Sequence, residues 1–284
     1  MRVVVLGAAG MAGHMVSRYL RLKGHNVIDV TRNGTPVVCD FENQDEVDNL
    51  FYLLAGDKID YVINCVGLLV ADSNSRPDRA AKLNAWLPHY VEHKLSNTDT
   101  KLIHLSTDCV FDGAKGFYFE EDTHTETNYY GRSKSFGEVN NDKDVTFRMS
   151  IIGPEIKESG TGLFHWFVNK SPDQVDGWDN AIWNGITTLE LAKCIDQYIQ
   201  EPTQTGIVHL VNNDNRISKY SLLSLINDIF EVGKSINRVS GPKSVNKCLV
   251  NTKKDYGISD YETQLKELKE FIHTPAYDAK HSHP

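Results

Sequence analysis

Near its N-terminus the chain reads Arg2-Val3-Val4-Val5-Leu6-Gly7-Ala8-Ala9-Gly10-Met11-Ala12-Gly13. The run from Val3 to Leu6 is continuously apolar and rich in β-branched residues, which is typical of a strand covered on both faces in a parallel sheet. After the glycines, apolar residues recur at helical spacing as far as Leu20, and Gly24 ends this pattern. The stretch therefore predicts a strand, a glycine turn and a helix in succession.

A glycine turn in this setting is typical of a dinucleotide site. Glycines permit a tight turn and let N–H groups at the start of the helix approach a pyrophosphate, where the helix dipole also favours anions. A turn with a purely structural role is the alternative. We interpret the turn as cofactor-binding, through Gly7, Gly10, Met11, Ala12 and Gly13.

Strand and helix patterns alternate along the chain. Further strands are expected at residues 26–30, 37–41, 61–67, 101–107 and 144–152. A helix is expected from Pro77 to about Leu95, and Thr187 with Glu190 three residues later is typical of the start of another helix. The alternation predicts a Rossmann-type α/β fold, that is, a doubly wound parallel sheet. We expect an NAD(P)-binding domain over residues 1–150 and a smaller, mainly substrate-binding C-terminal lobe over 151–275, with some segments returning to the sheet. The polar residues 276–284 are expected to form a flexible tail.

The end of the second predicted strand bears on the choice of cofactor. Arg32 stands there, and an arginine can pair with the extra phosphate of NADP, whereas an acidic residue grips the ribose hydroxyls of NAD. We therefore expect NADP; in the alternative, Asp29 binds the ribose of NAD. Asp40, with Phe41 beside it, is expected near the adenine. Ligands lie beyond the carboxyl ends of parallel strands, so the nicotinamide is expected near Cys65, Val66 and Gly67.

A candidate catalytic pair follows farther along the chain. Tyr130 and Lys134 are four residues apart and share one face of a helix, so the ammonium is expected to favour the ionised phenol. The strand over 101–107 delivers Thr107 to the same carboxyl edge of the sheet. Tyr130 is thus a candidate proton donor, since a general acid works best when its pKa approaches the operating pH. An exposed helix face is the alternative for the isolated pair.

The composition excludes several classes of protein. The net charge of −8 argues against general nucleic-acid binding. The apolar runs fall far short of the roughly 20 residues that span a bilayer, and no secretory leader is seen. Five cysteines without a Cys-x-x-Cys pair fit a reducing compartment and give no zinc signature. We expect a soluble cytoplasmic protein without a metal site.

Three motifs, in this order, carry a resemblance to a known family. They are the glycine turn, Ser106-Thr107-Asp108-Cys109-Val110-Phe111-Asp112-Gly113, and Tyr130-Gly131-Arg132-Ser133-Lys134. The chain resembles the extended short-chain dehydrogenase/reductases, and within them the dTDP-4-dehydrorhamnose reductase group. The resemblance implies NADPH-dependent reduction of the 4-keto group of a nucleotide-linked 4-keto-6-deoxy sugar, in the synthesis of surface polysaccharide deoxysugars. It allows a homodimer.

The resemblance also implies residue roles. Thr107 would orient the ketone, Tyr130 would protonate it, and Lys134 would lower the pKa of Tyr130 and hold the nicotinamide ribose. The group usually has tyrosine and tryptophan where this chain has Cys109 and Ile151, which leaves open whether the sugar is carried on dTDP, UDP or GDP. The expected substrate contacts are Asp108, Cys109, Phe111, Arg148, Ile151, Trp166 and Lys247.

Other functions occur within the same fold. A 4,6-dehydratase of this superfamily has Asp-Glu after the threonine, and the chain has Asp108-Cys109, so the missing carboxylate argues against dehydration. An epimerase would use the same threonine, tyrosine and lysine and stays open. A regulatory module that keeps a cofactor without its chemistry is a third interpretation.

Overall fold

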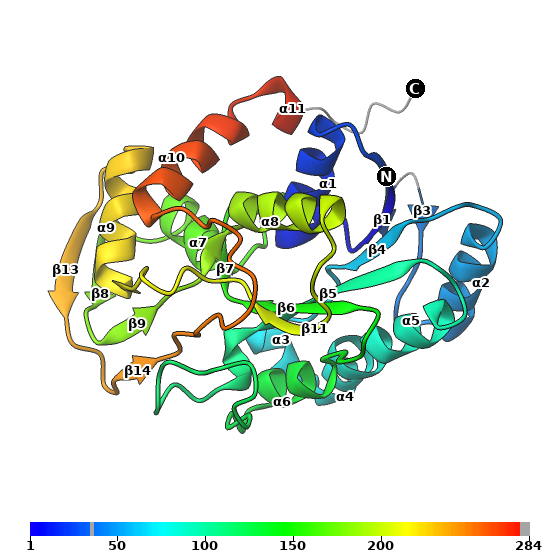
Figure 1. Cartoon of the computed structure of the whole chain (residues 1–284). Coiled ribbons are helices and arrows are strands. Elements are labelled where there is room, and N and C mark those ends of the chain that lie inside the picture. The colour runs from blue at the N-terminus through cyan, green and yellow to red at the C-terminus, as the bar shows by residue number, and fades with distance from the viewer. Residues whose placement is uncertain (35–36, 279–284) are drawn as a thin grey trace.

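A seven-stranded parallel sheet forms the centre of the computed structural model, which describes residues 1–34 and 37–278 (Figure 1). The strand order is β11-β6-β5-β4-β1-β2-β3, and every neighbouring pair is parallel. The predicted doubly wound α/β fold is confirmed. The strands are β1 (Arg2–Leu6), β2 (Asn26–Thr31), β3 (Val37–Val38), β4 (Tyr61–Asn64), β5 (Lys101–Thr107), β6 (Val145–Met149) and β11 (Gly206–His209).

Helices cover both faces of this sheet, which explains the unbroken apolar run of β1. Val3 and Val5 pack into one core cluster with α1 (Met11–Leu22) and α8 (Thr188–Gln200). Val4 and Leu6 pack into a second cluster with α2 (Gln44–Leu54) and α5 (Leu87–Leu95). Because successive strand residues point to opposite faces, a strand between two helical layers has no polar position.

Three predicted elements differ from the structure in their bounds. The third strand ends at Val38, after which the chain turns toward Asn43, the N-cap of α2. The fourth strand ends at Asn64, whose side-chain oxygen accepts a hydrogen bond from the Val66 N–H at 3.1 Å. The helix expected over 77–95 is α4 (Pro77–Ala80), a π-helix η1 (Ala81–Trp86) and then α5.

The predicted strand over 144–152 divides at Ser150. Its second part, β7 (Ile151–Ile152), leaves the main sheet and pairs with β10 (Ile186–Thr187). The smaller lobe contains short strands and two helices. They are α7 (Leu163–Asn169), β8 (Gln174–Trp178), β9 (Ala181–Trp183), β12 (Ile217–Ser218), α9 (Lys219–Phe230), β13 (Ser235–Val239) and β14 (Val245–Asn246).

Later segments return to the main sheet and to α1. Strand β11 pairs with β6, and α8 packs against α1. After α10 (Tyr261–Ile272), the helix α11 (Pro275–Asp278) includes the first residues of the expected flexible tail. The Tyr277 ring of α11 lies under the guanidinium of Arg18 on α1 at 4.3 Å, so these residues pack against the protein. The remainder of that tail, 279–284, lies outside the described residues. Within the described chain, no helix has the length and apolarity to cross a membrane.

The glycine turn joins β1 to α1 at the point where the strand order reverses. Gly7 has a φ of +76°, which favours glycine, and its N–H donates to the Val30 carbonyl at 2.9 Å. A Cβ on Gly13 would lie 2.2 Å from the Gly7 carbonyl oxygen, so only glycine allows this approach. The first turn of α1 is therefore held against the end of β1, where dinucleotides bind in such sheets.

We predict that Gly13→Ala lowers the free energy of unfolding by about 1–3 kcal/mol, because the added methyl group overlaps fixed backbone. Urea denaturation measures this change. Gly56→Ala is the matched control, since a Cβ at Gly56 meets no atom within 4 Å. Equal stability of the two variants would contradict the close approach.

Candidate active site

The three predicted catalytic residues come from two neighbouring elements. Thr107 ends β5, and Tyr130 and Lys134 lie on α6 (Tyr129–Phe136). Asn128 caps this helix by accepting a hydrogen bond from the Gly131 N–H at 2.9 Å. A Cβ on Gly131 would lie 2.3 Å from the Cys109 carbonyl oxygen, so glycine here lets α6 approach the turn that follows Thr107.

The Tyr130 phenol lies beside the Thr107 hydroxyl. Burial raises the pKa of Tyr130; the nearby Cys109 and Asp108 add to this increase, and the Thr107 hydroxyl opposes it. The phenol is therefore protonated at neutral pH. A protonated phenol next to a hydroxyl can donate a proton to an oxygen atom that both groups contact.

Lys134 does not act on the phenol as expected. Its side chain is buried, and Nζ donates to the Leu105 carbonyl at 2.6 Å and faces Gly67. Burial lowers the pKa of Lys134 to about 8, while Glu138 and Cys65 oppose this decrease. The expected lowering of the Tyr130 pKa by Lys134 is thus replaced by an increase, because burial dominates at the phenol and the ammonium faces a backbone carbonyl.

Asn84 connects the two sides of the site, a role that its sequence context did not reveal. It is fully buried in the π-helix η1, accepts from the Leu68 N–H at 2.8 Å and donates to the Ser133 hydroxyl at 3.1 Å. It thereby joins the loop after β4 to the turn of α6 between Tyr130 and Lys134. Its polarity on an otherwise apolar helix face was the available signal.

The glycine turn has the features of a pyrophosphate site. Gly10 is the N-cap of α1 and provides no side-chain cap, so the N–H groups of Met11, Ala12 and Gly13 are left for an anion. A Cβ on Gly7 would lie 3.1 Å from Val66 and 3.2 Å from the Cys65 backbone. The residues predicted to bind the cofactor at β1 and after β4 are therefore adjacent.

The two candidate residues at the second strand differ in their exposure to solvent. Asp29 is buried within β2, accepts from the Ser17 hydroxyl at 2.5 Å and pairs with Arg21 at 2.9 Å, so it is not presented to a ribose. Arg32 follows the strand and is exposed. Asp40 is half-buried at the same edge, whereas the Phe41 side chain lies in the core.

Some of the predicted substrate contacts surround Thr107. Asp108 is buried and hydrogen-bonded to the Thr107 hydroxyl at 3.2 Å, and Cys109 follows it. Burial raises the pKa of Asp108, and the ammonium of Lys247 opposes that increase. Lys247 also pairs with Glu126 at 3.2 Å, so the lobe contributes a cation beside the end of β5.

Two predicted contacts, Phe111 and Arg148, lie in the protein interior instead. Phe111 is fully buried and stacks on Tyr118 with ring centroids 4.1 Å apart. Arg148 is 1% exposed, and its guanidinium pairs with Glu138 at 2.5 Å and with His209 at 2.8 Å. The sequence placed Arg148 within a strand but did not reveal the partners that long-range folding brings to it.

Ile151 and Trp166 lie on the lobe side. Ile151 is half-buried in β7 and pairs with Ile186 of β10. Trp166 is on α7, where it lines a shallow hollow, and the ammonium of Lys219 lies 5.8 Å from its ring centroid. Contact of these two side chains with a substrate stays a prediction.

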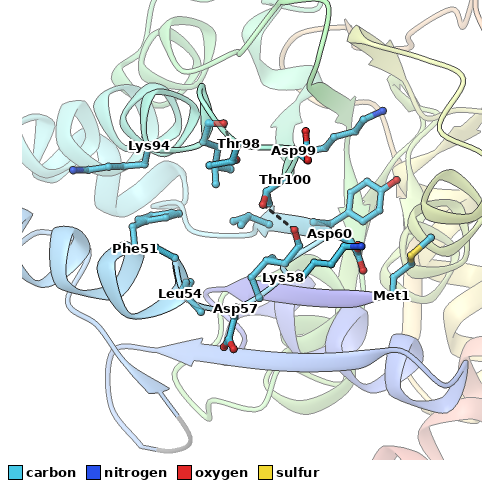
Figure 2. A pocket seen from close by; sticks show the side chains of 16 residues that line it. Met1, Phe51, Leu54, Asp57, Lys58, Asp60, Lys94, Thr98, Asp99 and Thr100 are labelled. Carbon is cyan, nitrogen blue, oxygen red and sulfur yellow. Dashed lines mark hydrogen bonds between the residues drawn. The ribbon is translucent and has the colours of Figure 1, made fainter.

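A separate hollow of about 420 Å³ lies at the opposite edge of the sheet (Figure 2). Phe51 and Leu54 of α2 and Lys94 of α5 line it, together with Tyr61 and Lys101, the first residues of β4 and β5. Thr107 and the glycine turn are at the other end of these strands. Ligands of open parallel sheets bind beyond the carboxyl ends, so this hollow is not the candidate active site.

Comparison with known proteins agrees with this arrangement. The model of a family described as the RmlD substrate binding domain matches residues 1–249. The chain belongs to this family. Membership in the RmlD substrate binding domain family confirms the resemblance to the dTDP-4-dehydrorhamnose reductase group that was based on the three sequence motifs.

Individual relatives differ in how much they share. The dTDP-4-dehydrorhamnose reductase of Mycolicibacterium smegmatis is 34% identical over 140 residues, which are 48% of this chain and 40% of that enzyme. The methionine adenosyltransferase 2 subunit beta of Mus musculus is 25% identical over 250 residues, covering 82% of this chain and 73% of the subunit. A crystal structure of the Bacillus anthracis dTDP-4-dehydrorhamnose reductase in complex with NADP shares the fold, with a TM-score of 0.79, 19% identity and coverage of 96% of this chain and 99% of that chain. The chain thus spans less than half of the mycobacterial enzyme.

We predict that Arg148→Met lowers the free energy of unfolding by about 3–5 kcal/mol, because Glu138 is left buried without its cation. The control is Arg238→Met, which removes an arginine 67% exposed in its ion pair with Asp179; a change within about 1 kcal/mol is expected there. Thermal or urea unfolding measures both. An Arg148 variant of normal stability would restore this residue as a candidate substrate contact.

Proposed function

We propose that the protein catalyses the NADPH-dependent reduction of the 4-keto group of a nucleotide-linked 4-keto-6-deoxy sugar, in the cytoplasm, for surface polysaccharide synthesis. The observation that carries this proposal is the placement of the Thr107 hydroxyl beside the Tyr130 phenol at the carboxyl edge of the sheet, with Lys134 on the same helix as Tyr130. Family membership and the name of the mycobacterial relative support the substrate class.

The residues present fit a dinucleotide cofactor. The glycine cradle, which a Cβ at Gly13 would fill, and the uncapped start of α1 suit a pyrophosphate, and Arg32 suits the additional phosphate of NADP. When bound, NADPH supplies the hydride for the keto carbon. Lys134, facing Gly67, is assigned to the nicotinamide ribose.

The protein groups handle the oxygen atom of the ketone. Thr107 and Tyr130 orient it through hydrogen bonds and stabilise the negative charge that develops on it, where preorganised donors contribute most. Tyr130 then gives up its proton to form the hydroxyl group. The raised pKa of Tyr130 keeps the phenol protonated until that step. Lys134, whose ammonium donates to the Leu105 carbonyl, is left to hold the nicotinamide ribose.

The likeness to the mouse adenosyltransferase subunit favours a second candidate function. That relative covers more of this chain than the mycobacterial reductase does, and its name identifies it as a subunit of another enzyme. A non-catalytic, cofactor-binding subunit would bind NADPH without reducing a sugar. The presence of threonine, tyrosine and lysine together makes the reductase our main proposal.

A substrate panel tests the proposal directly. Purified protein is mixed with NADPH and with 4-keto-6-deoxy sugars linked to dTDP, UDP or GDP, and the absorbance of NADPH is followed. We expect oxidation with at least one sugar. NADPH binding without oxidation by any sugar would favour the subunit interpretation.

We predict that Tyr130→Phe lowers kcat by about 10²–10⁴-fold, the usual contribution of a positioned general acid. The Kd for NADPH should stay within about twofold, since the change removes only the hydroxyl group. Steady-state kinetics and fluorescence titration give the two values. A Phe variant as active as wild type would refute the assignment of Tyr130.

We predict that Arg32→Ala weakens NADPH binding by about 10-fold or more and leaves NADH binding nearly unchanged, because only NADPH offers the phosphate with which arginine pairs. Parallel titrations with both cofactors measure the ratio. Arg18→Ala is the control, because the guanidinium of this α1 residue lies against the Tyr277 ring, 4.3 Å from its centroid. This variant should leave the affinities for both cofactors unchanged. Equal losses for NADPH and NADH would overturn the choice of NADP.

A further inference from the structure

A buried carboxylate, Glu138, follows the C-cap of α6, four residues after Lys134. Its side chain is 5% exposed, and both of its oxygens have protein partners. Oε1 accepts from the Ser106 hydroxyl at 2.6 Å and from the Arg148 Nε at 2.8 Å, and Oε2 accepts from an Arg148 terminal nitrogen at 2.5 Å. Adjacent strand residues point to opposite faces, so Ser106 meets Glu138 while Thr107 meets Tyr130.

Two histidines complete this network. Burial lowers the pKa of His124 and, with Arg148, that of His209, so both rings are neutral at pH 7 and accept from the guanidinium. With its Nε2 accepting, His124 donates from Nδ1 to the Ser135 hydroxyl at 2.5 Å. The network thus touches Ser106 and Ser135, the chain neighbours of Thr107 and Lys134.

A buried ion pair of this kind contributes little net stability, because the desolvation of both charges offsets their attraction. The carboxylate of this pair can still favour the charged form of a third group, Lys134. Lys134 Nζ donates to the Leu105 carbonyl, and Glu138 accepts from the hydroxyl of the next residue, Ser106, so the ammonium and the carboxylate bind adjacent residues of β5. Burial disfavours the charged form of Lys134, and Glu138 is the first of the groups that favour it. The other titratable groups that face Lys134 are Cys65 after β4 and His104 on β5.

We infer that Glu138 is a positioning residue of the reaction, which keeps Lys134 charged and holds the end of β5 in place through Ser106. This inference rests on the proposed function for its catalytic meaning. Its electrostatic part concerns Lys134 alone and stands without a substrate. In this role Glu138 acts through Lys134 and Ser106 and contacts neither the cofactor nor the sugar.

Glu138→Gln tests the inference because it keeps the size of the side chain and an acceptor for Ser106 but removes the charge. An activity that needs charged Lys134 is lost as the pH rises through the pKa of Lys134, about 8. Without Glu138 that pKa falls, so the alkaline limb of the kcat profile should move to lower pH by about one unit or more. KM should change less than kcat at pH 8.

A second readout needs no turnover. Protein labelled with ¹³Cε-lysine is titrated by NMR, and the Lys134 resonance is identified by its loss in Lys134→Met. The midpoint should fall by about one unit in Glu138→Gln and stay near that of wild type in Glu138→Asp, which keeps the charge. If Glu138→Gln does not fold, the double variant Glu138→Gln with Arg148→Met removes the unpaired cation and should show the same lowered midpoint.

Glu190→Gln is the matched control. Glu190 is also buried and paired, with Lys193 at 2.6 Å, but lies on α8 away from Lys134. Its variant should show the wild-type midpoint even if it is less stable. An unchanged Lys134 midpoint in Glu138→Gln refutes the inference. A shifted midpoint in a protein that reduces none of the sugars supports it and refutes the proposed function instead.

Discussion

Direct contact between backbones fixes the geometry of the site. Added Cβ atoms at Gly13, Gly131 and Gly137 would lie 2.2 Å, 2.3 Å and 1.9 Å from carbonyl oxygens of Gly7, Cys109 and Asn84. Side chains on these glycines would push α1 and α6 away from the carboxyl edge of the sheet. The absence of side chains at these positions therefore allows the glycine turn and α6 to lie beside the ends of β1 and β5.

Burial sets the electrostatics within this frame. It raises the pKa of Tyr130 and lowers that of Lys134, so each group is shifted toward its neutral form. In the proposed mechanism the neutral phenol of Tyr130 donates the proton, whereas Lys134 holds the nicotinamide ribose in its charged form. A negative charge near Lys134 therefore favours its charged form, whereas Tyr130 needs no compensating charge to stay protonated. Glu138 is the first of the groups that favour charged Lys134.

The sequence predicted the features that depend on local pattern. The apolar run of β1, the glycine turn and the spacing of Tyr130 and Lys134 are properties of short segments. The Thr187 cap of α8 was also visible, and its hydroxyl accepts from the Glu190 N–H at 3.1 Å. The π-helix around Asn84 was not, because its hydrogen-bond pattern has no distinct apolar period.

The burial of charged residues could not be predicted from the sequence, because it depends on partners from distant segments. Asp29 and Arg148 both lie within strands, and the sequence pattern does not show whether a charged side chain there is exposed. Both are buried, with partners from other elements. Glu138, His124 and His209 come from three separate segments, and only the folded chain brings them to Arg148. The direction of the Lys134 side chain, toward Leu105 and away from the phenol, depends on the same long-range packing.

The division of one predicted strand into β6 and β7 has a mechanical consequence. Within four residues the chain passes from the ladder with β5 to a ladder with β10, and the Ile186 N–H donates to the Ser150 carbonyl at 2.9 Å between the two. A hinge at this junction would have to break one ladder or the other. The lobe that carries Ile151 is therefore joined to the sheet by continuous backbone hydrogen bonding and not by a free linker.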